Sequence, residues 1–185
     1  MSLIARVLLL AVLALTGCIP VDQEARAKAA TAVIETPLAG FCSATYIGPN
    51  IVLTASHCIL VDSGPIAING KAGKIISARH DGSDIAVLVV DIPSTAWAKV
   101  GRRAKQGDRL FFYGHASGFD RLLRRGYVIG FYDKRTLVDM MVGRGDSGAG
   151  VFNERGEVIG VVSSVFSAHP SFHVGAIRQP DEGFL

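Results

Sequence analysis

Internal repeats, amphipathic helices and long apolar runs are all missing from this 185-residue sequence. After residue 30 apolar residues do not recur at helical spacing, and no stretch repeats at the spacing of about 20–50 residues that solenoids require. The N-terminal apolar run from Val7 to Leu15 is shorter than the roughly 20 residues of a membrane-spanning helix. Helical bundles and solenoids are therefore excluded, and the N-terminal run does not fit a spanning helix.

An excess of charge of either sign is also missing. The chain has 19 basic and 16 acidic residues, a net charge of +3, and its densest basic pairs, Arg102–Arg103 and Arg124–Arg125, are isolated. Without a basic stripe, nucleic-acid binding is not expected. Hydrophobic residues make up 49% of the chain, enough for a folded core in one domain or two small lobes.

The N-terminus has the pattern of an export signal. Arg6 precedes the apolar run, as the charged residue precedes the apolar region of a secretory signal peptide. The run ends in Leu15-Thr16-Gly17-Cys18, which is similar to the bacterial lipobox, whose cysteine is acylated and becomes the mature N-terminus. We therefore expect residues 1–17 to be a lipoprotein signal peptide and Cys18 to carry a membrane anchor. An ordinary signal peptide or an uncleaved anchor is the alternative.

The residue after Cys18 indicates the membrane to which the lipoprotein would be sorted. Ile19 stands where an Asp would favour the inner membrane, so the outer membrane, facing the periplasm, is expected if the host is Gram-negative.

Two of the three cysteines then remain, Cys42 and Cys58. Cysteine pairs of exported chains are usually oxidised, and a bridge closing so short a loop would add roughly 3 kcal/mol. Two buried free thiols are the alternative.

Residues 18–30 are polar and alanine-rich, which predicts a tether or a short helix. Beyond them, short runs rich in Val, Ile, Phe and Tyr are separated by Gly, Pro, Asn and Asp, the pattern of a β-sandwich or barrel. The stretch from Asp91 to Gln106 interrupts this pattern and is predicted to connect two β lobes. The expected strands are Ala32–Glu35, Gly40–Tyr46, Ile51–Thr54, Lys74–Arg79, Ile85–Val90, Arg109–Gly114, Gly126–Tyr132, Arg135–Met141, Gly150–Phe152, Val158–Ser164 and Phe172–Ile177.

Glycines crowd the stretch MVGRGDSGAG, residues 141–150, around Asp146 and Ser147. Glycine adopts positive φ angles and lets other backbone come close, so such a loop can point N–H groups at a developing negative charge. A plain surface loop could have the same composition. The four glycines are Gly143, Gly145, Gly148 and Gly150.

Hydrolysis through a serine needs a nucleophile, an imidazole that takes its proton and a carboxylate that orients the imidazole. Ser147 lies in the glycine-rich loop, His57 follows an apolar run in IVLTASHC, and Asp84 precedes another in DGSDIAVLVV. Asp81 and Asp91 flank Asp84 and remain alternatives to it. The histidines outside these motifs, expected to be surface or core residues, are His80, His115, His169 and His173.

The motifs TASHC, SDIAVL and GDSGAG, in this order, resemble the active-site motifs of the trypsin-like (chymotrypsin-fold) serine peptidases. The resemblance extends from about Gly40 to Ile177 and includes the cysteine pair beside the histidine. It implies an all-β fold of two antiparallel six-stranded barrels with the active site between them. The implied layout is a peptidase domain over 31–178, with lobes over about 31–92 and 107–178, a linker over 91–106 and a tail over 179–185.

The resemblance also implies a role for each site residue. His57, Asp84 and Ser147 would form the catalytic triad, and the N–H groups of Gly145 and Ser147 the oxyanion hole. Asp146 would be a buried, charge-paired residue that organises the loop, with nearby Arg144 as the expected cation. The substrate pocket would be lined by Met141, Ser163, Ser164 and Val165.

Taken together, the sequence predicts a lipid-anchored serine endopeptidase with no metal or cofactor that cleaves peptide or protein substrates. Met141 brings no carboxylate to the base of the pocket and Val165 would narrow its entrance, so a small or medium apolar residue before the scissile bond is expected. A catalytically inactive binding or scaffold lipoprotein and an esterase using the same triad are the alternatives. Nothing in the sequence indicates an oligomeric state.

Overall fold

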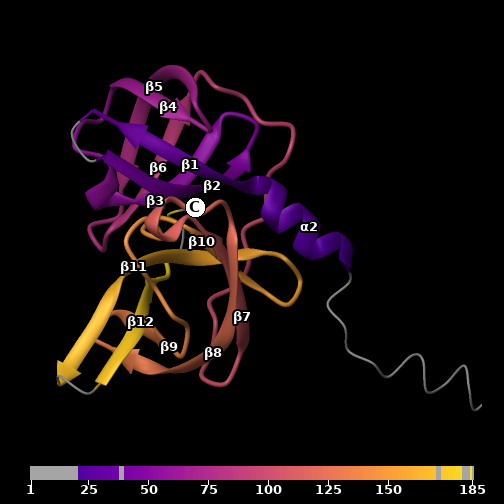
Figure 1. Cartoon of the computed structure of the whole chain (residues 1–185), viewed down its shortest axis with the longest axis vertical. Coiled ribbons are helices and arrows are strands. Elements are labelled where there is room, and N and C mark those ends of the chain that lie inside the picture. The colour runs from indigo at the N-terminus through magenta and orange to yellow at the C-terminus, as the bar shows by residue number, and fades with distance from the viewer. Residues whose placement is uncertain (1–20, 38–39, 170–171, 181–183, 185) are drawn as a thin grey trace, which may run out of the picture.

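The computed structural model describes residues 21–37, 40–169, 172–180 and 184. They form two closed antiparallel six-stranded barrels, one above the other in Figure 1. This arrangement confirms the predicted all-β double-barrel fold. The expected signal peptide and Cys18 lie outside the described residues.

Each barrel is built from consecutive strands. The first has the strand order β1-β2-β3-β6-β5-β4 and the second β10-β11-β12-β9-β8-β7. A short 3₁₀ turn follows β3 (η1, Ser56–Cys58) and another follows β7 (η2, Ala116–Gly118). The strands are β1 (Thr31–Thr36), β2 (Gly40–Gly48), β3 (Ile51–Ala55), β4 (Gly64–Ile68), β5 (Lys71–His80), β6 (Ile85–Val90), β7 (Arg109–Gly114), β8 (Leu122–Tyr132), β9 (Arg135–Val138), β10 (Gly150–Asn153), β11 (Val158–His169) and β12 (Phe172–Arg178).

The strands differ from the sequence-based expectation in several places, including the early starts of β5 at Lys71 and of β8 at Leu122. Strand β4 was not expected, because a glycine and Pro65 at its start indicate a turn; it pairs with both β1 and β5 and closes the first barrel. Strand β9 ends at Val138, three residues before the expected Met141, and β11 runs on to His169. These ends depend on strand pairing, which the sequence pattern does not show.

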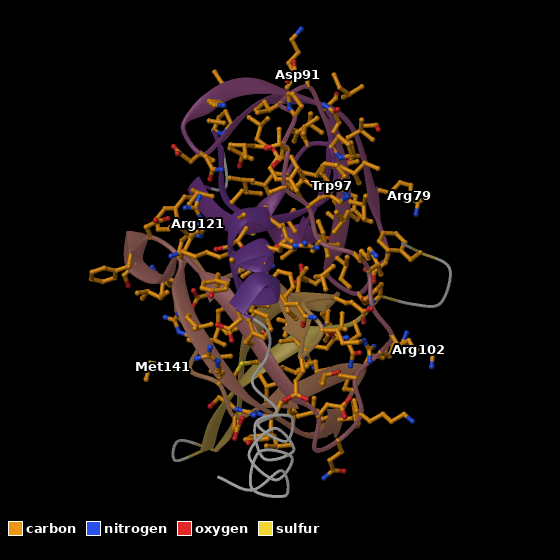
Figure 2. All side chains as sticks on the ribbon, turned by 90° about the vertical axis from the view of Figure 1, so that its right-hand side faces the viewer. Arg79, Asp91, Trp97, Arg102, Arg121 and Met141 are labelled. Atoms are coloured by element: carbon orange, nitrogen blue, oxygen red, sulfur yellow. A yellow bond between two sulfur atoms is a disulfide. The ribbon has the colours of Figure 1, made fainter. Side chains whose placement is uncertain are left out.

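Residues Val21–Ala30 form a helix, α2, rather than an extended tether. Its small residues Ala27 and Ala30 are buried, and it contacts β1, β2 and β7, so it touches both barrels. An ion pair between Glu24 and Arg125 adds to this contact. Figure 2 shows α2 lying across the junction of the barrels. None of the helices in the described part of the chain has the length and apolarity to cross a membrane.

The two barrels share an apolar interface. Leu53 and Ile85 of the first barrel are fully buried in one cluster with Phe111 and Phe152 of the second. The rings of Phe111 and Phe152 are stacked with their centres 5.3 Å apart. The end of β3 and the first residue of β6 lie at this interface. The turn after β3 and the loop before β6 therefore face the second barrel.

Candidate active site

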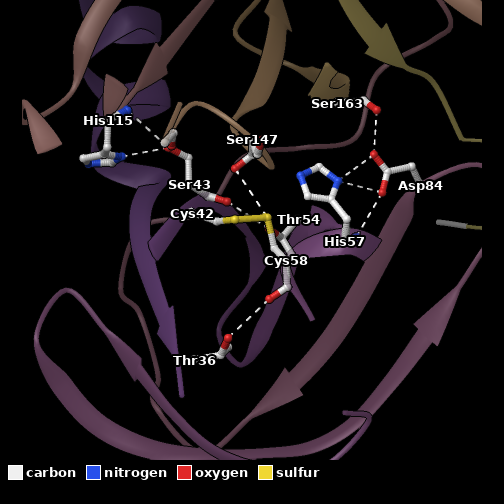
Figure 3. The surroundings of a disulfide bond; sticks show 11 residues. Thr36, Cys42, Ser43, Thr54, His57, Cys58, Asp84, His115, Ser147 and Ser163 are labelled. Atoms are coloured by element: carbon white, nitrogen blue, oxygen red, sulfur yellow. Dashed lines mark hydrogen bonds and ion pairs between the residues drawn. A yellow bond between two sulfur atoms is a disulfide. The ribbon is translucent and has the colours of Figure 1, made fainter. Parts of the chain in front are cut away.

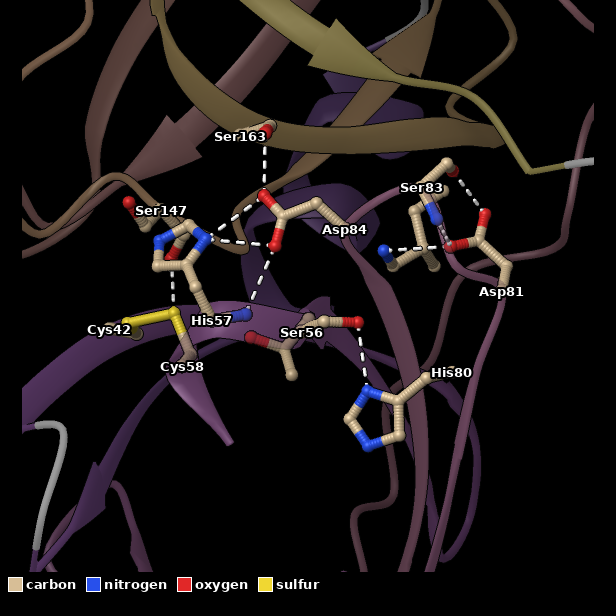
Figure 4. A network of polar contacts seen from close by, with 12 residues as sticks. Cys42, Ser56, His57, Cys58, His80, Asp81, Ser83, Asp84, Ser147 and Ser163 are labelled. Atoms are coloured by element: carbon tan, nitrogen blue, oxygen red, sulfur yellow. Dashed lines mark hydrogen bonds and ion pairs between the residues drawn. A yellow bond between two sulfur atoms is a disulfide. The ribbon is translucent and has the colours of Figure 1, made fainter. Parts of the chain in front are cut away.

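His57 and Asp84 are brought together by neighbouring strands. His57 lies in η1 directly after β3, Asp84 lies directly before β6, and the ends of these strands pair at Ala55 and Ile85. The His57 Nδ1 atom is 2.9 Å from each carboxylate oxygen of Asp84 (Figure 4). The backbone N–H of His57 also donates to Asp84 Oδ1, at 3.0 Å. The carboxylate therefore holds both the ring and the backbone of the histidine.

The turn before β6 decides which aspartate faces the histidine. The carboxylate of Asp81 accepts the N–H groups of Ser83 and Ile85, so it organises the turn. Asp84 then adopts a φ of +78°, a conformation that costs a side-chain-bearing residue energy and often marks a functional position. Asp91, the other alternative, accepts the N–H of Lys74. Of the three aspartates, Asp84 is the one in contact with His57.

Ser163 of β11 adds a contact from the second barrel. Its hydroxyl donates to Asp84 Oδ2 at 2.6 Å. The sequence placed Ser163 in the wall of the substrate pocket, whereas here its hydroxyl is bonded to the carboxylate. The other residues expected in the pocket are exposed: Met141, with 80% of its surface accessible, Ser164 and Val165. Their role in a pocket stays a prediction.

The pKa values of the pair are shifted in opposite directions. Burial alone would raise the pKa of Asp84, but hydrogen bonds from the His57 ring, the Ser163 hydroxyl and the His57 N–H together hold it below its ordinary value. The hydrogen bond to Asp84 raises the pKa of His57, against the lowering effect of burial. Because Asp84 stays ionised and accepts from Nδ1–H, the Nε2 atom of neutral His57 is left able to accept a proton.

Ser147 lies on the opposite side of the imidazole from Asp84 in Figure 4. Within the described residues no hydrogen bond joins its hydroxyl to His57. Its backbone is fixed, because its carbonyl accepts the N–H of Ser43, at 2.8 Å. A disulfide between Cys42 and Cys58 joins β2 to η1 beside this point (Figure 3). The bridge therefore connects the strand that holds Ser147 to the turn that carries His57.

Two N–H groups of the glycine-rich loop point away from the protein's own acceptors. The carbonyl of Arg144 accepts the N–H of Ser117 at 2.7 Å, and the carbonyl of Asp146 accepts the N–H of Ala149 at 2.9 Å. In a planar trans peptide the N–H points opposite to the carbonyl, so the N–H groups of Gly145 and Ser147 face the other way. Neither has an acceptor among the described residues, which leaves both available to a ligand oxygen.

Two of the loop glycines are required by the local geometry. Gly145 has a φ of +97°, and a Cβ on it would clash with the carbonyl of His115 and the ring of Phe41. Gly148 has a φ of +82°, and a Cβ there would clash with Ser43 and Thr54. The close approach of the loop to β2 and β3 therefore explains why glycine flanks Asp146 and Ser147.

Asp146 is fully buried behind the loop. Its Oδ2 atom accepts the N–H of Gly143 at 2.8 Å, and its Oδ1 atom lies 3.6 Å from Nη1 of Arg124. The expectation that Arg144 would supply the cation is wrong: Arg144 is exposed, and Arg124 reaches the carboxylate from β8. Burial raises the pKa of Asp146, while the Gly143 N–H and Arg124 partly oppose that rise.

Three potential metal ligands also meet beside the site. Ligand atoms of Cys42, His57 and Cys58 lie within 4.8 Å of one another. Both sulfur atoms are used in the disulfide, and a metal would need them as thiolates. This cluster therefore does not offer a metal site.

Two closed barrels with a histidine, a carboxylate and a serine at their junction define the class of trypsin-like double-barrel proteins. The sequence matches the family of trypsin-like peptidase domains over residues 42–161. This match covers more than half of the chain, and the chain belongs to that family.

Relatives of known name are similar over part of their length. A probable periplasmic DegP-like serine endoprotease of Pseudomonas putida is 28% identical over 137 residues, which are 65% of this chain and 28% of the relative. Its counterpart in Pseudomonas savastanoi pv. phaseolicola is 30% identical over 100 residues, 49% of this chain and 21% of the relative. The chain thus spans less than a third of the length of these relatives.

Solved structures share the fold. The inactive form of the Rv3671c protease of M. tuberculosis superimposes with a TM-score of 0.70 at 19% identity, covering 85% of this chain and 87% of that one. A serine endoprotease from Yersinia pestis gives a TM-score of 0.67 at 20% identity, covering 85% and 61%. At these identities the likeness concerns the double barrel itself.

Replacing Arg124 with Met removes the cation beside buried Asp146 and should raise the pKa of that carboxyl further. A carboxyl whose pKa is higher in the folded than in the unfolded state, where it is about 4, destabilises the fold as it ionises. The free energy of unfolding of Arg124→Met should therefore fall as the pH rises from 4 to 8, by about 2 kcal/mol more than in the native chain. Urea unfolding across this range measures the difference.

The control for this experiment is Arg144→Met, which removes an exposed arginine from the loop that carries Asp146. It should follow the pH dependence of the native chain. Identical curves for the two variants would show that Arg124 does not stabilise the ionised form of Asp146.

Proposed function

We propose that the chain is a serine endopeptidase that works through Ser147, His57 and Asp84. The observation that carries this proposal is the hydrogen-bonded pair of His57 and Asp84 facing a serine on a loop with two unpaired N–H groups. The match to the trypsin-like family supports this proposal, as does the similarity to relatives named as probable serine endoproteases.

In the proposed mechanism, Ser147 Oγ attacks the carbonyl carbon of the scissile peptide while its proton passes to Nε2 of His57. The negative oxygen that forms is bound by the N–H groups of Gly145 and Ser147. One such donor lowers the activation free energy by about 3 kcal/mol. His57 then protonates the leaving amine as the C–N bond breaks, which leaves an acyl ester on Ser147. Water attacks this ester with His57 again as the base; the bond to Ser147 Oγ then breaks, His57 returns the proton to that oxygen, and the acid product leaves.

The carboxylate of Asp84 stabilises the charged imidazole between these steps. Three donors surround it, from the His57 ring, the His57 backbone and Ser163. They keep the carboxylate ionised and in place, so that the proton on Nδ1 stays there and Nε2 carries out the proton transfers. Ser163 therefore acts on the reaction through Asp84.

We further propose that the substrate carries a small or medium apolar residue before the scissile bond. Met141 and Val165 are exposed apolar side chains and bring no carboxylate that could pair with Lys or Arg. One or two methylene groups change the free energy of such a pocket by about 1–3 kcal/mol, so the preference should be broad.

We also propose that the protein is exported and held at a membrane by lipid on Cys18. The lipobox-like sequence supports this proposal, and so do the Cys42–Cys58 disulfide and the word periplasmic in the names of the relatives. Disulfides persist in oxidising compartments such as the periplasm. In this setting α2, which begins three residues after Cys18, would connect the anchor directly to both barrels.

The proposed triad predicts the behaviour of three variants toward a fluorophosphonate probe, which forms a bond to an activated serine. Ser147→Ala and His57→Ala should abolish labelling. Asp84→Asn should slow it by about 10⁴-fold, because the amide stabilises the wrong tautomer of the imidazole. In that variant the pKa of His57 should also fall, because the carboxylate that raises it is lost. The pH below which the labelling rate declines should therefore be lower than in the native chain.

In-gel fluorescence of the disulfide-bonded protein measures these rates. Asp91→Asn is the matched control, since Asp91 bonds the Lys74 backbone away from the site, and it should label as the native chain does. A folded native chain that does not label would instead support the binding or scaffold role.

The pocket proposal predicts the outcome of cleavage of a randomised peptide library. Alanine, valine and leucine should dominate the position before the cut, because Met141 and Val165 offer apolar side chains and no charge. Mass spectrometry of the products identifies that position. A profile dominated by lysine or arginine would contradict the assignment of Met141 and Val165.

The anchor proposal predicts the mass of the mature chain purified from a Gram-negative host. Its first residue should be Cys18, and its mass should exceed that of residues 18–185 by the mass of the attached acyl chains. Cys18→Ser should remove this lipid mass and release the protein from the membrane fraction. An unmodified Cys18 in the native mature chain would refute the proposal.

A further inference from the structure

Ser43 lies on β2 directly behind the glycine-rich loop (Figure 3). Its side chain is fully buried. Its hydroxyl donates to the carbonyl of Gly145 at 2.7 Å and lies 3.0 Å from Nδ1 of His115. The backbone N–H of His115 also donates to this hydroxyl, at 3.2 Å. One hydroxyl of the first barrel therefore joins two segments of the second.

The protons in this group can be assigned from the partners. The carbonyl of Gly145 can only accept, so the single proton of the Ser43 hydroxyl points to it. Nδ1 of His115 must then be the donor toward Ser43. Among the described residues, Nε2 of His115 has no hydrogen-bond partner, and Oδ1 of Asp120 lies 3.5 Å from it. Burial lowers the pKa of His115, which favours the neutral ring.

The carbonyl that the Ser43 hydroxyl binds belongs to Gly145, and the backbone of a glycine is easily rotated. Gly145 has a φ of +97° and no side chain, so its backbone can rotate more easily than that of other residues. Its N–H, like that of Ser147, has no acceptor among the described residues. Ser117 holds the peptide on one side of Gly145, through the carbonyl of Arg144, and Ser43 holds the peptide on the other side.

We propose that Ser43 and His115 are positioning residues that keep the N–H of Gly145 aimed at the developing oxyanion. This inference rests on the proposed serine endopeptidase function. His115 orients the Ser43 hydroxyl by donating from Nδ1, and the hydroxyl fixes the Gly145 carbonyl. Neither residue touches the reacting atoms. Without the hydroxyl, the peptide between Gly145 and Asp146 is held only by the bond from the Asp146 N–H to the carbonyl of Gly143. The backbone of Gly145 is then less firmly fixed, and the oxyanion loses a donor for part of the time.

The chain offers a matched control on the same strand. Thr45 is fully buried, and its hydroxyl accepts the N–H of Gly150 at 2.9 Å, so it too joins β2 to the second barrel. Gly150 ends the glycine-rich stretch and begins β10, and its N–H is not one of the two proposed oxyanion donors. Removing the hydroxyl of Thr45 should therefore lower stability without changing the chemistry.

The experiment measures labelling by a fluorophosphonate probe, whose phosphoryl oxygen occupies the position of the oxyanion, on the full disulfide-bonded chain. The maximal labelling rate and the half-saturating probe concentration are determined separately. Losing an oxyanion donor outright costs about 10²–10³ in rate, so Ser43→Ala should lower the maximal rate about 10–100-fold. The half-saturating concentration should change less than about twofold, because binding of the probe precedes the charge development.

Two variants of His115 give an independent reading if Ser43→Ala does not fold. His115→Asn places an amide N–H where Nδ1–H was and should keep the native rate within about threefold. His115→Leu has no donor and should lower the maximal rate as Ser43→Ala does. Thr45→Val should label at the native rate with reduced thermal stability.

A Ser43→Ala chain that is folded and labels as fast as Thr45→Val would overturn the inference, as would equal rates for His115→Asn and His115→Leu. Ser147→Ala is measured in the same series. If the native chain labels and Ser147→Ala does not, the proposed nucleophile stands whatever the Ser43 variants do. If the native chain does not label, the proposed function fails first.

Discussion

The packing of the two barrels against each other is the constraint on which the site depends. His57 and Asp84 come from the first barrel, while Ser147 and Ser163 come from the second. The buried apolar interface between the barrels sets the distance between these pairs. A displacement of about 1 Å at a catalytic site can cost two orders of magnitude in rate, so the interface has a chemical role as well as a stabilising one.

Polar contacts across the same interface set the orientation that apolar packing leaves free. The hydroxyl of Ser163 reaches Asp84, that of Ser43 reaches Gly145, and that of Thr45 accepts from Gly150. Each joins a buried hydroxyl of one barrel to a group of the other. Because an unpaired buried polar group costs more than its hydrogen bond gains, these contacts permit one relative placement of the barrels and disfavour the others.

Asp146 shows the cost of building the loop in this way. A fully buried carboxylate is unfavourable by itself, and here the backbone groups of Gly143 and Ala116 and the guanidinium of Arg124 offset the burial only in part. In return, the carboxylate holds Gly143 and so the start of the loop. The loop thus stores some instability at the point where the two N–H groups must stay unpaired, as functional sites commonly do.

Much of the fold could be predicted from the sequence, because its strands are short apolar runs with turn residues between them. The exception, β4, begins with Gly64 and Pro65, residues typical of turns, and is a strand because β1 and β5 offer it partners. The histidine, aspartate and serine motifs were recognisable from their local residues. Their neighbours were not: Arg124 and His115 stand in no motif, and the contact of Ser163 with Asp84 spans 79 residues.

The range of each interaction explains which features could be predicted from the sequence and which depend on the tertiary structure. Local sequence by itself determined the β-strands other than β4, the glycine-rich character of the loop and the three candidate triad residues, because turn propensity and motif chemistry act within a few residues. The tertiary structure alone decided that Asp84 rather than Asp81 or Asp91 faces His57. It alone also supplied Arg124 to Asp146 and Ser43 to the Gly145 carbonyl, because these contacts depend on strand register and on how two closed barrels pack.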